Sequence, residues 1–444
     1  MAMAGPPLLL LLLLLVAAVA ASGGATATPA GCAAPADGGS TLRVLHAFGP
    51  CSPFHPSTSW EDTVLDLLSR DDSRLIYLAS LATARRSFVP IAPGRQVLQT
   101  PTYVVRARLG TPPQPLLLAL DTSSDVAWLP CSGCTGCPYS AVAPLFDTSR
   151  STTHRPVPCG APPCWQVPNP SCPFGSAACG FNLTYGSSSL VASLAQDSLS
   201  VASDVVPGYT FGCLQKTTGP SVPPQGLLGL GRGPLSFLSQ TKNLYASTFS
   251  YCLPSFKSLN FSGTLRLGPV GQPYRIKTTP LRSNPHRSSL YYVDMVGIRV
   301  GRKVVDIPPA ALAFDAATGG GTIFDSGTMF TRLVAPAYVA VRDEFRRRVR
   351  GKVTSLGGFD TCYNGPFVAP AITFMFVGMN VTLPADNYLI HSTAGSITCL
   401  AMAATPDNVN SVLNVIANMQ QMNHRVLFDV PNGRLGVARE RCSF

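Results

Sequence analysis

The stretch Leu116-Leu117-Leu118-Ala119-Leu120-Asp121-Thr122-Ser123-Ser124 has a counterpart in the second half of the chain, Gly321-Thr322-Ile323-Phe324-Asp325-Ser326-Gly327-Thr328. In each stretch an apolar run of the kind that forms a buried strand ends in an aspartate, and small hydroxyl residues follow. The repetition predicts two similar lobes that each bring one carboxylate to a shared site. Two carboxylates at hydrogen-bonding distance share one proton, which suits acid–base chemistry on a bound water.

The residues around each aspartate have the sizes and donors that such a pair needs. Small residues let the backbone come close, so that amide N–H groups can bond the carboxylates. We expect Ser124 and Thr328 to bond the outer oxygens, and Thr122 and Ser326 to cross-link the two loops. A lone Asp-Ser-Gly is a common turn tripeptide, so the repeated context carries the interpretation.

A second pair of similar tripeptides, called the second echo below, extends the repeat. Leu227-Leu228-Gly229 and Val415-Ile416-Ala417 each consist of two apolar residues and a small one, well downstream of their aspartates. Other catalytic motifs are absent from the sequence: there is no Gly-x-Ser-x-Gly, no His-Glu-x-x-His and no phosphate-binding glycine loop. The six histidines are scattered, so we expect no metal and no cofactor.

The N-terminal sequence predicts a secreted precursor. The chain has 444 residues, enough for two domains. Residues 8–15 are eight consecutive leucines, followed by valine and alanines, a pattern that resembles a signal-peptide core with its cleavage site. A membrane-spanning helix needs ~20 apolar residues, so we expect a signal peptide at residues 1–21 and no membrane anchor in the mature form.

The next segment, residues 22–98, is expected to be a propeptide. Residues 22–40 read as a linker, and Trp60–Leu81 has apolar residues at near-helical spacing with charges between them. An amphipathic helix ahead of an all-β body is typical of a removable propeptide. Arg86, Arg95 and the stretch near Thr100 are alternative cleavage positions, and the sequence does not choose among them.

From Tyr103 onward the sequence has an all-β character. Short β-branched and aromatic runs are separated by turn residues, and the chain contains 41 prolines and 39 glycines. Few helices are expected, chiefly Ala335–Val349. The expected strands are Tyr103–Leu109, Leu116–Leu120, Val126–Leu129, Tyr209–Phe211, Leu227–Leu230, Gly263–Leu267, Tyr291–Val300, Thr322–Phe324, Ala371–Phe376 and Val426–Val430.

The fourteen cysteines indicate disulfides formed in an oxidising compartment. Twelve lie beyond residue 100, enough for six bridges, and Cys32 and Cys51 fall in the expected propeptide. The run Cys131-x-x-Cys134-x-x-Cys137 could indicate an iron–sulfur or zinc site, but its fourth ligand position falls on Ala141. Disulfides are therefore the preferred interpretation. Three glycosylation acceptors agree with secretion: Asn182, Asn260 and Asn380.

The formal net charge of +11 belongs to the expected mature part, since residues 22–98 hold six arginines and six acidic residues. Much of the excess lies in 342–350, a segment of helical composition. The alternatives are a nucleic-acid patch and a solvated helix face, and we favour the solvated face because no recognition motif accompanies it. A basic secreted protein can also adhere to acidic polysaccharide, which is a hypothesis.

Taken in order, the motifs resemble those of pepsin-like aspartic proteases, and within them the plant group typified by nepenthesin and its apoplastic relatives. The similarity covers nearly everything from Tyr103 to Phe444. Matching stretches are Asp121–Cys131, Tyr185-Gly186, Gly226–Gly231, Phe249–Leu253, Tyr291–Val293, Asp325–Thr328 and Gln420–Val426.

The resemblance implies an all-β, bilobal fold with few short helices, with lobes at 99–275 and 276–444, a cleft between them and the aspartates at its floor. It implies a flap hairpin carrying Tyr185 and Gly186 over bound peptide, and a cysteine-rich insertion at 131–179. It also implies bridges Cys362–Cys399 and Cys252–Cys442, while pairings in the first lobe stay open. We expect a monomer located in the apoplast or cell wall in preference to the vacuole.

Three departures from the family pattern bear on activity: Ser123 stands where most relatives have glycine, the flap continues as Ser187-Ser188-Ser189 in place of the usual Asp-Gly-Ser type sequence, and Ala417 replaces glycine. The leading hypothesis is a secreted aspartic-type endopeptidase that hydrolyses polypeptides at acidic pH and is made as a zymogen. Acid is expected to loosen the propeptide by protonating its carboxylates. The alternative is a catalytically weak or inactive relative that acts as a binding protein of the xylanase-inhibitor type. Substrate identity and cleavage preference are not predicted.

Overall fold

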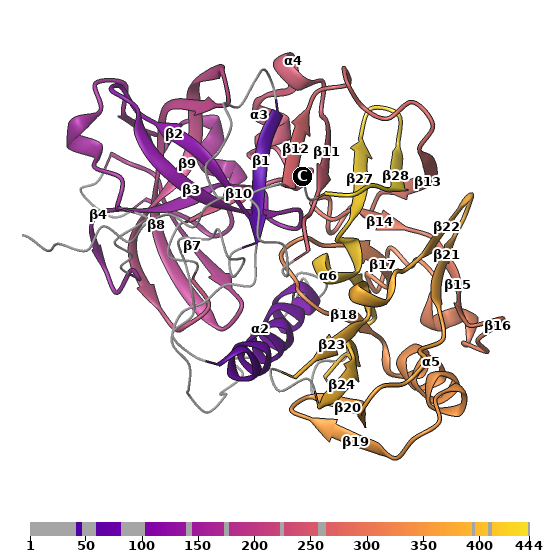
Figure 1. Cartoon of the computed structure of the whole chain (residues 1–444). Coiled ribbons are helices and arrows are strands. Elements are labelled where there is room, and N and C mark those ends of the chain that lie inside the picture. Colours follow the sequence, from indigo (N-terminus) through magenta and orange to yellow (C-terminus); the bar gives the residue numbers. More distant parts are fainter. Residues whose placement is uncertain are drawn as a thin grey trace, which may run out of the picture.

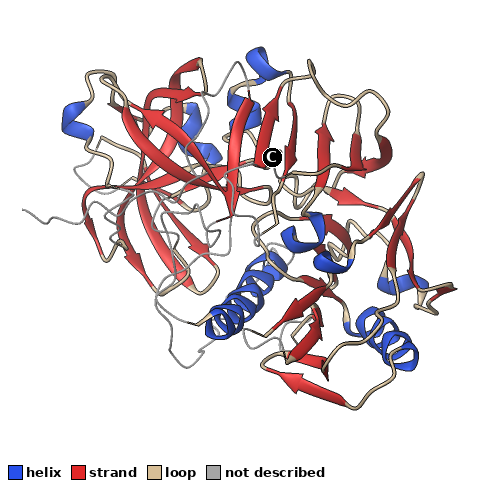
Figure 2. Ribbon diagram, viewed as in Figure 1, coloured by secondary structure: helices blue, strands red, loops and turns tan. Residues whose placement is uncertain are grey.

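The computed structural model describes residues 41–46, 59–80, 103–138, 144–172, 177–222, 226–255, 263–392, 396–406 and 411–442. The expected signal peptide, the alternative cleavage positions, Cys32, Cys51 and Asn260 lie outside these ranges. Strands dominate the molecule (Figure 2) and form two lobes, and the long helix α2 (Trp60–Ser80) lies between them (Figure 1). No helix in the described ranges is long and apolar enough to cross a membrane.

The first lobe is built from antiparallel pairs whose side chains alternate between core and surface. β2 (Tyr103–Leu109) pairs with β3 (Gln114–Asp121), with Val104 opposite Ala119. β8 (Ser188–Val201) and β9 (Asp204–Thr218) form a long hairpin. The remaining strands of this lobe are β4 (Trp128–Thr135), β5 (Arg155–Pro156), β6 (Pro170–Ser171), β7 (Gly180–Tyr185) and β10 (Leu227–Gly229).

The second lobe contains one strand group that carries Asp325 and two four-stranded sheets. The first group includes β14 (Tyr292–Val293), β17 (Gly321–Phe324), β18 (Thr331–Leu333), β25 (Met402–Ala404) and β26 (Leu413–Ile416). One four-stranded sheet holds β15 (Met295–Val300), β16 (Lys303–Val304), β21 (Ile372–Phe376) and β22 (Met379–Thr382). The other holds β19 (Val353–Leu356), β20 (Phe359–Asn364), β23 (Leu389–His391) and β24 (Ile397–Leu400).

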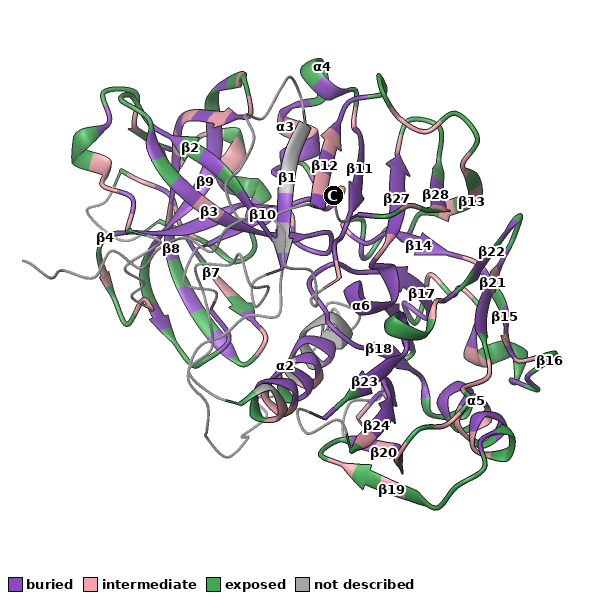
Figure 3. Ribbon diagram, in the orientation of Figure 1, coloured by how far each residue is buried: buried purple, intermediate pink, exposed green. Residues whose placement is uncertain are grey.

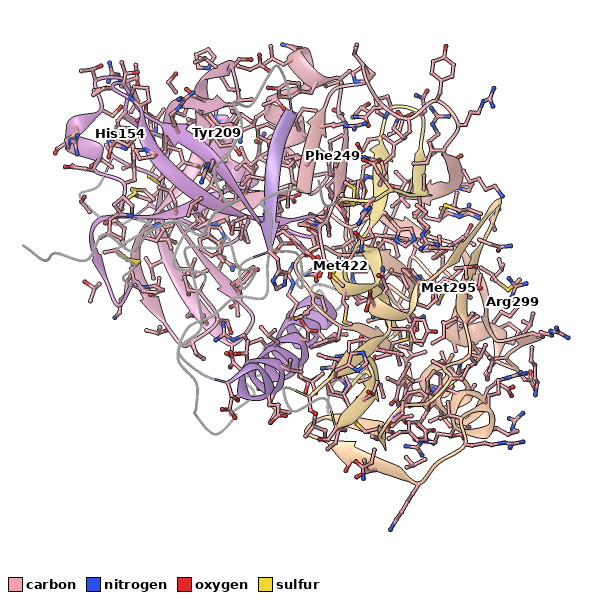
Figure 4. All side chains as sticks on the ribbon, viewed as in Figure 1. His154, Tyr209, Phe249, Met295, Arg299 and Met422 are labelled. Carbon is pink, nitrogen blue, oxygen red and sulfur yellow. A yellow bond between two sulfur atoms is a disulfide. The ribbon has the colours of Figure 1, made fainter. Side chains whose placement is uncertain are left out.

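A central sheet joins the lobes. Its strands are β11 (Thr248–Cys252), β12 (Gly263–Leu267), β13 (Lys277–Arg282), β27 (His424–Asp429) and β28 (Arg434–Arg439). The N-terminal strand β1 (Thr41–His46) pairs antiparallel with both β2 and β12, so it fills the position between them (Figure 1). Phe249, labelled in Figure 4, stacks on Phe428 with ring centroids 4.6 Å apart, in the apolar core of this sheet.

Among the described residues, the α-helices are short apart from α2 and α5 (Ala335–Arg348). The others are α3 (Phe237–Gln240), α4 (Lys242–Tyr245) and α6 (Asn418–Gln421). The arginines of α5 meet acidic partners: Arg348 lies 2.6 Å from Glu344, and Arg342 and Arg346 each lie 3.3 Å from Asp360. These pairs agree with the solvated helix face and leave the segment with little free charge for a nucleic acid.

Six disulfides join the cysteines of the described ranges. Two are the pairs that the family resemblance implies, Cys252–Cys442 and Cys362–Cys399. The four in the first lobe, which the sequence left open, are Cys131–Cys213, Cys134–Cys137, Cys159–Cys172 and Cys164–Cys179. The Cys-x-x-Cys-x-x-Cys run is therefore used for disulfides.

Candidate active site

Each of the two aspartates follows a buried strand that lies parallel to the strand of the second echo. β3 pairs with β10, with Asp121 opposite Gly229, and β17 pairs with β26, with Phe324 opposite Ile416. The main chain holds both positions, because Leu230 N donates to Asp121 O at 2.8 Å and Asp325 N donates to Ile416 O at 3.1 Å. Both aspartates are fully buried. The two sequence repeats are thus one structural repeat.

The loops that carry the aspartates are cross-linked by their hydroxyl residues. Thr122 N donates to Ser326 Oγ at 3.2 Å, and Ser326 N donates to Thr122 Oγ1 at 3.0 Å. Each hydroxyl also reaches the opposite strand: Thr122 Oγ1 donates to Phe324 O at 3.3 Å and Ser326 Oγ to Leu120 O at 3.0 Å. These reciprocal bonds fix the two carboxylates relative to each other.

The hydrogen bonds to the carboxylates follow the same pattern in both loops. The inner oxygen, Oδ1, accepts from an amide two residues on, Ser123 N at 2.9 Å in the first loop and Gly327 N at 3.0 Å in the second. The outer oxygen, Oδ2, accepts from a hydroxyl three residues on, Ser124 at 3.0 Å and Thr328 at 2.5 Å. In both loops, therefore, each carboxylate oxygen accepts a hydrogen bond from its own loop.

The hairpin of β7 and β8 closes over the first aspartate. Its tip is Tyr185-Gly186-Ser187-Ser188, where Gly186 takes φ +57°, a conformation that favours glycine. Tyr185 OH donates to Asp121 Oδ2 at 3.2 Å, and its ring meets Trp128 edge-on at 5.4 Å between centroids. Burial, followed by the negative charge of Asp121, raises the pKa of Tyr185 well above its usual value.

The guanidinium of Arg74, on α2, occupies the space between the two carboxylates and the flap. Arg74 Nη2 donates to Asp121 Oδ1 at 2.6 Å, and Arg74 Nε lies 3.5 Å from Asp325 Oδ2. The guanidinium also contacts Ser123 Oγ and lies 5.0 Å from the centre of the Tyr185 ring. One buried cation therefore touches both aspartates and the flap tyrosine.

Flanking contacts hold α2 in this position. Asp71 accepts from Met329 N at 2.7 Å and from Phe330 N at 2.5 Å, the amides that follow the second aspartate loop. Arg332 pairs with Asp72 and donates to Leu68 O at 3.0 Å. Buried apolar residues on the same helix, including Leu67, Leu68 and Leu75, pack into the core. Figure 3 shows buried positions along α2.

Sequence reasoning missed three groups of this site. Nothing in the sequence distinguished Arg74 from the other arginines of residues 22–98. Asn418 Nδ2 donates to Ser326 O at 3.0 Å and Gln421 Nε2 donates to Asp325 O at 3.2 Å, so α6 supports the second loop. Asn418 directly follows Ala417, and Gln421 lies in the matching stretch Gln420–Val426, so their positions were the available signal.

The small residues that end the two tripeptides of the second echo, Gly229 and Ala417, differ in whether the surrounding backbone leaves space for a side chain. A Cβ at Gly229 would lie 2.0 Å from the carbonyl oxygen of Asp125, so this glycine is required by close backbone approach. Ala417 occupies the matching place in the second lobe, is fully buried and accepts its methyl group without a positive φ. The departure from glycine at this position leaves the second loop intact.

The two described glycosylation acceptors, Asn182 and Asn380, are both exposed. Asn182 and Tyr185 are three residues apart on β7, so their side chains point to opposite faces of the strand. A glycan on Asn182 would therefore project away from the aspartates.

Comparison with known proteins shows to which family the chain belongs. Residues 103–269 match the family model described as Xylanase inhibitor N-terminal, and residues 290–439 match Xylanase inhibitor C-terminal. Aspartyl protease AED3 of Arabidopsis thaliana is 50% identical over 431 residues, which cover 94% of this chain and 95% of that protein. The chain belongs to the plant nepenthesin-type group of pepsin-like aspartic proteases.

Other members of this group agree. Aspartyl protease 25 of Oryza sativa subsp. japonica is 48% identical over 425 residues, covering 90% of this chain and 94% of that protein. Aspartic proteinase nepenthesin-1 of Nepenthes gracilis is 32% identical over 352 residues, covering 77% of this chain and 78% of that protein. These relatives confirm that the chain is an aspartic-type endopeptidase.

Solved structures confirm the pepsin-like fold. The soybean basic 7S globulin superposes with a TM-score of 0.62 at 20% sequence identity, covering 77% of this chain and 94% of that chain. The protein edgp superposes with a TM-score of 0.61 at 21% identity, covering 77% and 92%. The all-β, bilobal architecture expected from the sequence is thereby confirmed.

Proposed function

We propose that this aspartic protease is a secreted zymogen that cleaves polypeptides at acidic pH, with Asp121 and Asp325 as its catalytic pair. The observation that carries the proposal is the single guanidinium of Arg74 in contact with both carboxylates. That contact supports both parts of the proposal, because it requires the aspartates to lie close together and it occupies the place where a catalytic water and a substrate carbonyl would sit.

In the proposed mechanism, one aspartate is ionised and the other holds the shared proton, the familiar arrangement of aspartic proteases. The ionised aspartate takes a proton from water as the water oxygen bonds to the substrate carbonyl carbon. The protonated aspartate gives its proton to the carbonyl oxygen, forming a neutral gem-diol. The C–N bond then breaks as the amine nitrogen receives a proton from the aspartate that took one. A hydroxyl of the gem-diol returns its proton to the other aspartate, so a carboxylic acid is released, the starting protonation state is restored, and no covalent enzyme intermediate forms.

Residues 22–98 act in this proposal as the propeptide, with β1 and α2 as its two docked elements. β1 is inserted into the central sheet, and α2 fills the space in front of the aspartates. A charged guanidinium between the two carboxylates leaves no room for the catalytic water. Activity would then require the removal of α2, with cleavage in the stretch that leads to β2.

The alternative of a binding protein draws on the family models, whose descriptions name xylanase inhibitors. Against it stand the two carboxylates with their complete set of amide and hydroxyl donors, which a binding protein does not need. Incubation of the purified precursor with a denatured protein at pH 4 tests the choice. We expect cleavage that pepstatin blocks, and an inert product after removal of residues 22–98 would favour the binding protein.

Location and partners are further proposals. We propose an extracellular monomer of the apoplast or cell wall, supported by the signal-like leader, six disulfides among the described cysteines, and the exposed acceptors Asn182 and Asn380. The positive net charge supports adhesion to acidic wall polysaccharide. Such adhesion predicts that the protein elutes from a polyanionic wall fraction as salt is raised; retention unaffected by salt would contradict it.

Protonation of His46 in acid would weaken the docking of the propeptide on the rest of the protein. It lies in β1 with its ring edge-on to Tyr103 at 4.9 Å between centroids. Burial lowers the pKa of His46 from 6.5 to about 3. The docked strand therefore favours the neutral imidazole, and its stabilisation, full above pH 6.5, is lost as the pH falls from 6.5 toward 3.

Asp71 has the opposite effect. Burial raises the pKa of its carboxyl from 3.8 to about 7, against the charge of Arg332 and the two amide donors Met329 and Phe330. A carboxyl with a raised pKa stabilises docking fully below pH 3.8 and loses this contribution as the pH rises through about 7. For Asp71 the sign is therefore opposite to the sequence-based expectation that protonated propeptide carboxylates release the body.

Replacing His46 by Leu and Asp71 by Asn should change the pH dependence of maturation in opposite directions. His46→Leu removes the group that weakens docking in acid, so maturation should accelerate less between pH 6.5 and 4.5, by up to ~100-fold at one proton per docking event. Asp71→Asn removes the group that strengthens docking in acid, so the acceleration should become steeper. Conversion rates followed on gels from pH 7 to 4 give both slopes, and parallel slopes in the two variants would contradict the assignment.

A further inference from the structure

The two aspartate loops differ in one donor. In the first loop Ser123 contributes its amide at 2.9 Å and also its hydroxyl, which donates to Asp121 Oδ1 at 2.8 Å. In the second loop the matching residue is Gly327, which contributes its amide alone. The departure of Ser123 from the family glycine therefore adds a hydrogen bond to one carboxylate and has no equivalent at the other.

The loops have space for this side chain at position 123 and would be crowded by one at position 327. A Cβ at Gly327 would lie 3.0 Å from Cγ and Oδ2 of Asp121, and 2.9 Å from Arg74 Nη2. Ser123 carries its Cβ with a side chain that is 3% exposed and with no positive φ. The Cβ of Ser123 leaves the loop intact, because the amide bond to Asp121 is retained.

We propose that Ser123 is a positioning residue that makes Asp121 the ionised member of the pair and leaves the shared proton on Asp325. This inference rests on the catalytic pair proposed above and assigns the two roles within it. A buried carboxylate that accepts one more hydrogen bond is favoured in its charged form, and the effect is large where water is excluded. Asp121 then takes the proton from water and Asp325 protonates the substrate carbonyl oxygen.

The other groups that face Asp121 do not impose the opposite assignment. Tyr185 OH, from the flap, also donates to Asp121. Arg74 leaves with α2 when the propeptide is removed. Asp125, four residues on, is engaged by Gly233 N at 2.8 Å and by Ser289, and Tyr251 lies on the side of Asp325. Of the donors around the pair, the flap tyrosine and Ser123 both act on Asp121.

The test compares the pH dependence of kcat/KM for matured wild type, Ser123→Ala and Ser123→Gly. Loss of one hydrogen bond to a charged group should move the acidic limb of the profile upward by about one to two pH units in both variants. Ser123→Thr, which keeps the hydroxyl, should restore the wild-type limb. Thermal unfolding of each variant separates this effect from loss of folded protein.

The possible outcomes are distinguishable. A wild-type protein without activity would remove the proposed function, whatever the variants do. An active wild type whose acidic limb coincides with those of Ser123→Ala and Ser123→Gly would overturn the role of Ser123 alone. A shift in Ser123→Gly but not in Ser123→Ala would assign the effect to the backbone and would also overturn it. If one variant fails to fold, the other with Ser123→Thr still decides.

Discussion

Replacing Asp121 or Asp325 by Asn should abolish hydrolysis, with kcat lower by about 10²–10⁴-fold or more. An amide has nearly the shape of the carboxyl but cannot take a proton from water at Asp121, and it cannot supply the shared proton at Asp325. Because the two groups act as a unit, the double variant should lose no more than either single one. Cleavage of a fluorogenic peptide by acid-treated protein measures the loss.

A matched control is Asp125→Asn. Asp125 is a half-buried carboxyl four residues from Asp121, but its oxygens are directed to Gly233 and Ser289. This variant should lose stability, by about 1–3 kcal/mol for disturbed buried hydrogen bonds, and should keep most of its activity. Because variants at the pair cannot mature themselves, a trace of tagged wild-type enzyme, removed before the assay, supplies the cleavage. Substantial activity in Asp325→Asn would show that the pair does not act as one site.

The catalytic pair and its donors were predictable because their geometry is local. The hydroxyls and amides that bond Asp121 and Asp325 lie two or three residues further along the chain, so the sequence contains the whole arrangement. The expected helices Trp60–Leu81 and Ala335–Val349 are confirmed within one residue as α2 and α5, since both have clear helical periodicity. The strand expected at 126–129 begins at Trp128 in the structure and runs to Thr135.

Most of the long hairpin of β8 and β9 was missed, since only Tyr209–Phe211, within β9, was expected as a strand. Residues 188–204 are rich in serine and alanine, which have weak strand preference, so no expected strand covered them. Their strand conformation depends on pairing over many residues, from Ser189 with Thr218 to Val201 with Asp204. Packing against the rest of the lobe overrides the weak local preference for strand. Local composition does not reveal this long-range stabilisation.

Arg74 was missed for a related reason. Its partner Asp121 is 47 residues away in sequence, and no motif marks an arginine that will meet a carboxylate at that separation. Only the placement of α2 between the lobes brings the two together. The sequence predicted that a helix precedes the body, and the structure adds that this helix carries a cation to the catalytic pair.

Replacing Arg74 by Gln should release the precursor from inhibition. The side chain of Arg74 is 5% exposed and pairs with both aspartates, so its removal leaves buried negative charge uncompensated. Truncating one member of such a pair costs about 2–5 kcal/mol, which corresponds to docking of α2 that is roughly 30- to 4000-fold weaker. We expect peptide cleavage by the uncleaved precursor at pH values where the wild-type precursor is inert, followed by faster maturation.

Arg70→Gln is the matched control for this prediction. Arg70 lies one turn earlier on α2 and pairs at 2.7 Å with Asp66 of the same helix, so its loss removes the same charge from the same element without reaching the aspartates. Activity and the state of the chain must be read together, from initial rates and gels at the same time points, because activity after cleavage says nothing about Arg74. If Arg74→Gln stays inert while uncleaved and matures at the rate of Arg70→Gln, then α2 covers the aspartates without inhibiting them, and the inhibitory element must be sought in β1.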